Sequence, residues 1–186
     1  MATWVACIVE TKVRPDFWDV ARKRGVRSST DAVPAHALID CDSGFDFLAS
    51  TRLAEALSRD LSAVAIGFVV QTTSDVHLTH VYASGECVRR LEYNRDDGGW
   101  GLVQGAPQAW EPAYFFAMPT DELSDEERAR CAAAERAGDA SSVVELLYPT
   151  STAPMWAVCK SLGIKEGQPD GAWKKPSLWS RLFGSA

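Results

Sequence analysis

The middle of the chain alternates between apolar segments and short turns, a pattern that predicts a β-meander over residues 62–104. Ala63–Gln71 is apolar on both faces, which is typical of a central strand covered by helices on one side and by helices or other chain on the second. Ser84-Gly85 and Asp97-Gly98-Gly99 are turn sequences that separate the later, alternating segments. The four expected strands are 63–71, 76–82, 87–93 and 100–104.

The first third of the chain predicts a strand, a helix, a second strand and a second helix. Thr3–Glu10 is rich in β-branched and aromatic residues, and the helix expected over 15–24 begins at a proline and stops at a glycine. His36–Asp40 is typical of a short strand, and residues 50–60 of an amphipathic helix. We expect both helices on one face of a mainly antiparallel sheet of five to six strands.

Beyond residue 120 the pattern becomes helical. Ser124 and Glu127 have the spacing of a capping box, and Asp139 is positioned to cap the next short helix. The expected helices lie within 124–138, 139–149 and 152–163. We expect this helical subregion, 121–164, to pack at the end or edge of the sheet.

These elements predict an α+β fold with a C-terminal helical segment. We expect a single domain over 1–164. Residues 165–176 have the composition of a linker, so 165–186 is expected to be a linker followed by a short basic-aromatic tail.

Net charge and the spacing of the cysteines restrict the class of partner and the cellular compartment that we expect. The 186 residues carry 19 Lys and Arg against 25 Asp and Glu, a net charge of −6 that disfavours nucleic acid and favours a basic or neutral partner. The five cysteines are scattered without a C-x-x-C pair, which predicts reduced thiols. The N-terminal segment lacks the basic start of an export signal, and the longest apolar run is too short to span a membrane. We therefore expect a cytoplasmic protein with no cofactor.

Three carboxylates alternate near the end of the second strand. Asp40, Asp42 and Asp46 surround Gly44 as at the start of a calcium loop, but Thr51 stands where that loop needs a bidentate glutamate. We therefore predict no metal site. The same acids are expected in a capped, solvated strand-to-helix loop that is available to a basic partner.

The histidines and cysteines do not predict a catalytic group. His77 and His80 are three apart in a strand, so they point to opposite faces and cannot share a metal. We expect one of them to form a cross-strand hydrogen bond and the other to lie at the surface. Cys87 should face residue 82 across the hairpin, away from either histidine. A serine nucleophile elbow, a Walker loop and a dinucleotide fingerprint are all missing from the sequence.

The tail concentrates exposed aromatic residues. Trp173 and Trp179 lie where little core is expected, and aromatic residues of this kind mark interfaces. Leu178, Trp179, Leu182 and Phe183 would share one side of a two-turn helix, which is too short to be stable alone. That helix would dock on its own domain, in a partner's groove or, weakly, on an anionic membrane surface.

A hairpin with a Gly-centred turn, a strand with Arg, Leu and Tyr, and a G-x-P-x-x-W-E element follow one another here. They comprise Gly85, Arg89 or Arg90, Leu91, Tyr93, Trp100, Gly105, Pro107, Trp110 and Glu111. With the later helix Ala157–Ile164, this third of the chain resembles an uncharacterised group of small bacterial α+β proteins. The resemblance implies a bacterial origin and a compact sheet protein, and implies no activity.

The sequence thus favours a non-catalytic, acidic protein-binding module of the immunity or adaptor type. Its expected contact residues are the three loop aspartates and the tail residues Trp173, Leu178, Trp179, Leu182 and Phe183. One alternative is a small enzyme with a site near the Asp40–Asp46 loop. Another is a peripheral membrane protein that attaches through its tail. The sequence does not indicate an oligomeric state.

Overall fold

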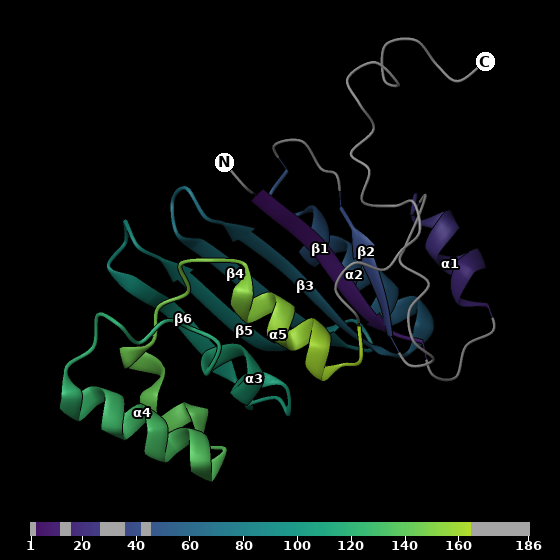
Figure 1. Cartoon of the computed structure of the whole chain (residues 1–186). Coiled ribbons are helices and arrows are strands. Elements are labelled where there is room, and N and C mark those ends of the chain that lie inside the picture. Colours follow the sequence, from purple (N-terminus) through teal and green to yellow (C-terminus); the bar gives the residue numbers. More distant parts are fainter. Residues whose placement is uncertain (1–2, 12–15, 27–35, 42–45, 165–186) are drawn as a thin grey trace.

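The computed structural model describes residues 3–11, 16–26, 36–41 and 46–164 (Figure 1). Its centre is a six-stranded antiparallel sheet with the order β2-β1-β3-β4-β5-β6. The strands are β1 (Thr3–Glu10), β2 (His36–Asp40), β3 (Val64–Gln71), β4 (Val76–Ala83), β5 (Glu86–Asn94) and β6 (Gly99–Gly105). The α+β class, the antiparallel sheet and the meander of β3 to β6 are confirmed, with strand ends within one residue of those predicted.

The first strand lies inside the sheet. β1 pairs with β2 on one side and with β3 on the other, so Cys7 is aligned with Ile39 and with Gly67. Residues Trp4 to Val9 are all buried. No turn sequence specifies these neighbours, because the connections on both sides of β2 include helices.

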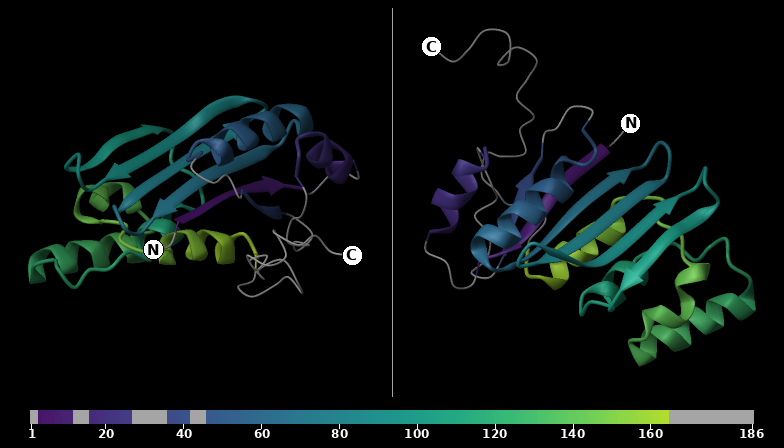
Figure 2. Two further views of the ribbon diagram at one scale, coloured as in Figure 1. Left: turned by 90° about the horizontal axis from the view of Figure 1, so that it is seen from above. Right: turned by 180° about the vertical axis from the view of Figure 1, so that it is seen from behind.

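Helices cover both faces of the sheet (Figure 2). Helices α1 (Phe17–Lys23) and α2 (Ala49–Leu61) pack with one face, whereas α3 (Glu111–Phe115) and α5 (Ala153–Ser161) pack with the other. Helix α4 (Asp125–Ala137) and the 3-10 helix η1 (Ala140–Leu146) extend this second layer. The expected position of the later helices at the end or edge of the sheet was therefore wrong for α5, and α3 was not predicted. Strands β1 and β3 are apolar on both sides, so each side needs a cover.

Helix α2 lies very close to β3. A Cβ atom on Gly67 would be 2.6 Å from the carbonyl oxygen of Ser50 and 2.6 Å from the Cα atom of Thr51. The Ser50 hydroxyl donates to the backbone carbonyl of Phe68 (3.0 Å), and the backbone N–H of Gly85 donates to Ser58 Oγ (2.9 Å). The missing side chain at Gly67 thus lets two serines fix the helix to the sheet.

The opposite face carries a row of large side chains that crosses five strands. Trp4, Val70, His77, Tyr93 and Trp100 are aligned in register from β1 to β6. The ring of Trp4 stacks on that of Trp156 in α5, with centroids 4.6 Å apart. This row anchors the second helical layer to the sheet.

The helix-end predictions were right for α4 and wrong for η1. Ser124 and Glu127 form the full capping box, and Gly138 ends α4 in the left-handed conformation. The Asp139 carboxylate does not cap η1 and instead accepts a hydrogen bond from the Ser141 hydroxyl at 2.5 Å. Because the Asp139 carboxylate accepts this local hydrogen bond, it does not accept one from the backbone N–H groups of the next turn.

Replacement of Gly67 by alanine should lower the free energy of unfolding by about 2–3 kcal/mol, because the new methyl group would meet backbone atoms of α2 that cannot move independently. Urea unfolding of the two chains measures the difference. Gly101→Ala is the matched control: its Cβ would have its nearest neighbour, the Glu92 carbonyl oxygen, at 4.0 Å. Equal effects of the two substitutions would contradict the close approach.

Candidate functional site

Two of the three loop aspartates lie in the described residues: Asp46 has a structural role, and Asp40 lies apart from a cavity. Asp46 accepts a hydrogen bond from the backbone N–H of Leu48 (3.2 Å) and forms an ion pair with Arg52, but α2 begins after Leu48 without a side-chain cap. Asp40 is exposed at the end of β2, and Asp42 lies outside the described residues. Among the residues that the structure describes, no group of three or more His, Cys, Asp or Glu side chains is arranged to hold a metal ion.

The tail predictions fall on residues outside the described part of the chain. They concern Trp173, Leu178, Trp179, Leu182 and Phe183, and they remain predictions. The domain limits 1–164 and 165–186 likewise remain expectations. Within the described residues, none of the helices has the length and apolar character needed to cross a membrane.

Both histidines of β4 are buried, so the expected surface histidine was wrong. His80 lies with its Nε2 atom 2.8 Å from Glu92 Oε1 on β5, which is the expected cross-strand contact. His77 is only 1% exposed because the second helical layer covers its face, and its two ring nitrogens have no hydrogen-bond partner among the described residues. Burial lowers the pKa of His77 to about 4. Both facts make His77 a neutral core residue.

The exposed cysteine is not paired with a histidine. Cys87 is aligned with Tyr82 in the hairpin, as predicted. Partial burial raises the pKa of the Cys87 thiol, and thiolates are the reactive form. The arrangement therefore does not favour a cysteine nucleophile.

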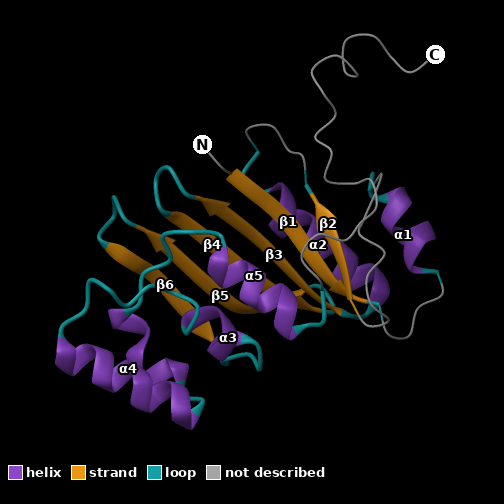
Figure 3. Cartoon of the chain, in the orientation of Figure 1, coloured by secondary structure: helices purple, strands orange, loops and turns teal. Residues whose placement is uncertain are grey.

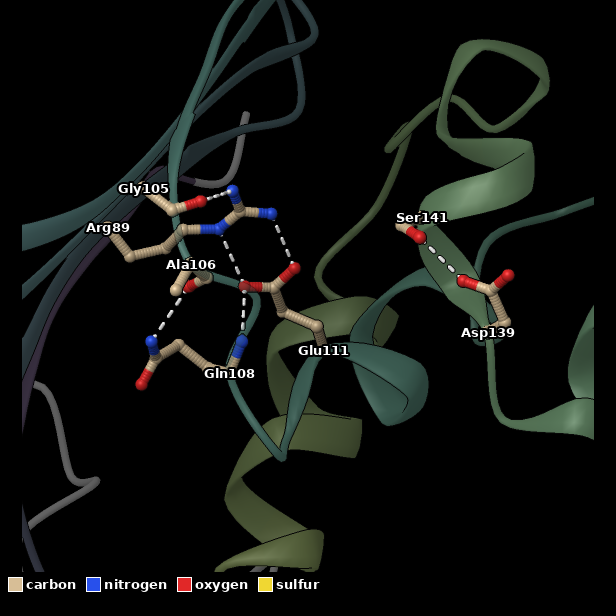
Figure 4. Close-up of polar contacts among 7 residues, drawn as sticks. All are labelled: Arg89, Gly105, Ala106, Gln108, Glu111, Asp139 and Ser141. Carbon is tan, nitrogen blue, oxygen red and sulfur yellow. Dashed lines mark hydrogen bonds and ion pairs between the residues drawn. The ribbon is translucent and has the colours of Figure 1, made fainter.

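A buried ion pair closes the corner between β5, β6 and α3 (Figure 4). The Arg89 guanidinium donates to both carboxylate oxygens of Glu111, through Nε (2.7 Å) and Nη2 (2.6 Å), and through Nη1 to the Gly105 carbonyl (2.6 Å). The Arg89 and Glu111 side chains are each 4% exposed. The backbone N–H of Gln108 also donates to Glu111, at 2.9 Å. The two buried charged groups and the Gly105 carbonyl therefore all have hydrogen-bond partners.

The local sequence explains the position of each residue in this corner. Arg89 shares the inner face of β5 with Leu91 and Tyr93, and Glu111 begins α3 just before Pro112, which favours a helix start. Gly105 has φ +88°, and a Cβ there would lie 2.0 Å from the Val88 carbonyl oxygen. The pair was not predicted from the sequence. An arginine on the apolar face of a strand was the available signal, because a buried guanidinium needs an anion.

A groove of about 380 Å³ lies beside this corner. Trp100, Val103 and Gly105 contribute from β6, and Ser141, Val144 and Glu145 from η1, with Arg89 also reaching it. Figure 4 shows Ser141 on the segment that faces the ion pair. We call this depression the β6 groove. It is open and mainly apolar, so its geometry suits a side chain of another molecule.

Strand β6 forms an exposed edge of the sheet (Figure 3). It contains no charged residue and no proline, and Val103 is 43% exposed. Among the described strands only β5 pairs with it. Edge strands are usually protected by charges or prolines, so an uncharged edge is a ready template for another strand.

A second cavity, of about 350 Å³, lies between the end of β5 and the turn before α4. Tyr93 and Tyr148 supply aromatic rings, and Asp121 and Glu122 supply carboxylates. Pro119, Leu123, Thr150 and Arg95 complete its lining. We call this cavity the tyrosine pocket.

Comparisons with known proteins do not assign the chain: no family model, no curated protein and no solved structure matches it. The resemblance to small bacterial proteins therefore stays an expectation. Of the residues on which it is based, Gly105 and Glu111 meet at Arg89, which is one of the two arginines that fit its strand motif.

Loss of one member of the buried ion pair should destabilise the protein strongly. We expect Glu111→Leu to lower the free energy of unfolding by about 3–5 kcal/mol, because Arg89 would keep a buried charge without a partner. The double variant Arg89→Met, Glu111→Leu should be less destabilised than Glu111→Leu alone. Urea unfolding provides both values.

The control is the pair of Arg95 and Asp75, in which the Arg95 side chain is 70% exposed and that of Asp75 is 14% exposed. Its removal by Arg95→Ala should cost less than about 1 kcal/mol. A Glu111→Leu variant as stable as Arg95→Ala would contradict the buried pair's structural role.

The buried His77 should make stability fall with acid. Its folded pKa of about 4 lies below the ordinary 6.5, so the unfolded chain takes up the proton first. The contribution of neutral His77 to the free energy of unfolding is complete above pH 6.5. It falls by about 3 kcal/mol as the pH falls toward 4. Denaturant unfolding at several pH values measures this slope.

The variant His77→Phe should flatten the slope between pH 6.5 and pH 4. His80→Gln should flatten it less, because the hydrogen bond to Glu92 partly offsets the effect of burial on the pKa of His80. An unchanged slope in His77→Phe would show that other groups cause the acid sensitivity.

Proposed function

We propose that this chain is a non-catalytic protein-binding module, of the immunity or adaptor type, that holds an extended segment of a partner protein along β6. The observation that carries the proposal is an exposed edge strand without charges, next to an apolar groove. A partner strand added to such an edge gains affinity from main-chain hydrogen bonds.

The part of β6 best suited to strand addition is Leu102–Gly105. The ladder between β5 and β6 shifts register between Glu92 and Tyr93, so that Gly101 is an extra residue on β6. Such a bulge disrupts the ladder locally and leaves its extra residue unpaired. Beyond the bulge Leu102–Gly105 is paired with β5 in regular register, and the Arg89 guanidinium holds the Gly105 carbonyl.

The β6 groove would supply sequence preference. Alternate side chains of an added strand point to the same face, and one of them would meet Val103, Val144 and Trp100. An apolar side chain fits this lining. The net charge of −6 favours a partner that is basic or neutral overall.

The location we propose is the cytoplasm. All five cysteines are free thiols, as in proteins from reducing compartments. The alternatives of an enzyme site near the Asp40–Asp46 loop and of attachment through the tail gain no support from the described residues. Asp46 is held by Leu48 and Arg52, and the tail lies outside those residues.

A lysine on the exposed edge should block the proposed interaction. The ligand would be a synthetic peptide enriched by the full chain from a displayed library of unstructured peptides. Fluorescence anisotropy should show that Val103→Lys weakens its binding about 10-fold or more, because the charge lies on the edge strand and in the groove. Methylation of alternate backbone nitrogens of the peptide should weaken binding similarly.

Val88→Lys is the matched control, since Val88 is 37% exposed on β5 and points to the other face from Arg89. It should change binding less than 2-fold, as a rough limit for an uninvolved surface charge. Equal losses in both lysine variants, or binding that persists with the methylated peptide, would overturn strand addition. Loss of binding in a chain that ends at Lys175 would instead assign the interaction to the tail.

A further inference from the structure

The tyrosine pocket presents aromatic rings at an accessible cavity. The centroids of Tyr93 and Tyr148 are 6.4 Å apart, with ring planes inclined by 48°. Tyr93 is buried, whereas Tyr148 is 38% exposed although it is a large aromatic residue. Exposed ring faces carry negative electrostatic potential and attract cations.

The two rings are held in place by the structure around them. Tyr93 packs edge-on against Trp100, with centroids 5.3 Å apart. The indole N–H of Trp100 donates to the carbonyl of Leu147 (2.8 Å), which fixes the residue just before Tyr148. A preformed wall of this kind loses little conformational entropy when a ligand binds.

Carboxylates complete the pocket. Asp121 and Glu122 are exposed, and neither forms an ion pair with another described residue. The cation in the described lining, Arg95, is bound to Asp75 (3.0 Å) on the neighbouring turn. The lining therefore holds two carboxylates without a salt bridge, and its described cation is bound to Asp75 outside the pocket.

Carboxylates in and beside the pocket stabilise the positive charge of Arg95. The pKa of Arg95 is raised, first by its hydrogen bond to Asp75 and also by Glu122. The pKa of the Tyr93 hydroxyl is raised as well, first by burial and then by Asp75, so the phenol stays neutral. A neutral phenol ring retains the quadrupole that attracts a cation.

We propose that the tyrosine pocket binds the side chain of a lysine or arginine from a partner protein. Its aliphatic stem would lie against the rings, and its charge would lie between the rings and the carboxylates of Asp121 and Glu122. A volume of about 350 Å³ is near the lower end for ligand sites, which suits one side chain better than a cofactor.

Assignment of the cation to a partner protein rests on the proposed function, whereas the preference of the pocket for a cation does not. The site is also separate from Val103 and the β6 groove. A titration with small blocked amino acids therefore tests the pocket without testing strand addition. Failure of either experiment leaves the other result intact.

The experiment is an NMR titration of the full chain with blocked lysine and blocked arginine (Nα-acetyl, N-methylamide), with blocked norleucine as the neutral control. The chain has four tyrosines, so the ring signals of Tyr93 and Tyr148 can be compared with those of Tyr82 and Tyr114. We expect saturable shifts at Tyr93 and Tyr148 with millimolar lysine or arginine, and none of comparable size with norleucine.

Two pairs of variants separate the contributions. Tyr148→Leu should weaken binding about 3- to 30-fold and Tyr148→Phe should preserve it, because the ring and not the hydroxyl attracts the cation. Glu122→Gln should weaken binding, whereas Glu126→Gln, a change at an exposed position on α4 outside the pocket lining, should not.

Several results would overturn the proposal. They are equal shifts with norleucine and lysine, equal effects of Glu122→Gln and Glu126→Gln, and the absence of saturable shifts with either cation. Choline that binds ten-fold more tightly than both blocked amino acids would assign the pocket to a small quaternary amine and not to a partner's side chain.

Discussion

Strands β1 and β3, which are neighbours inside the sheet, have no polar face to turn toward water. Residues Trp4 to Val9 of β1 and Ala65 to Val70 of β3 are buried on both sides of the sheet. Two layers of helix are therefore needed, and the N-terminal helices alone supply only one. This constraint explains why the chain returns after β6 to lay α3 and α5 on the second face. It also explains why Tyr114 and Phe115 of the short helix α3 are fully buried.

The return of the chain after β6 depends on the corner formed by Arg89, Gly105 and Glu111. A buried arginine on β5 needs an anion, and Glu111 at the first turn of α3 supplies it with two hydrogen bonds. The same guanidinium binds the Gly105 carbonyl, so the end of β6 and the start of α3 are fixed together. A buried ion pair contributes little net stability over apolar residues, but it specifies one geometry when its partners are fixed. Here that geometry leaves β6 at the edge of the sheet.

The two candidate binding features share a structural support. Trp100 lines the β6 groove, packs against Tyr93 and donates to the carbonyl of Leu147, next to Tyr148. The groove is mainly apolar and the tyrosine pocket is acidic, so together they would suit a segment with an apolar and a basic side chain. Such a segment agrees with the acidic balance of the whole chain. Helix η1 forms one side of the β6 groove, and the segments just before α4 and just after η1 form one side of the tyrosine pocket.

Local pattern alone determined the strands, the meander and the capping box of α4, because each depends on residues within a few positions of one another. Contacts between segments distant in sequence decided which side chains are buried, which are paired and which edge of the sheet is open. His77 is buried only because segments more than thirty residues later cover its face, and Arg89 finds Glu111 across 22 positions. The lack of charge in β6 can be read from the sequence, but its exposure follows from its place at the end of the strand order. Sequence periodicity shows which side of a strand is apolar, but the tertiary structure decides what covers that side and which edge remains open.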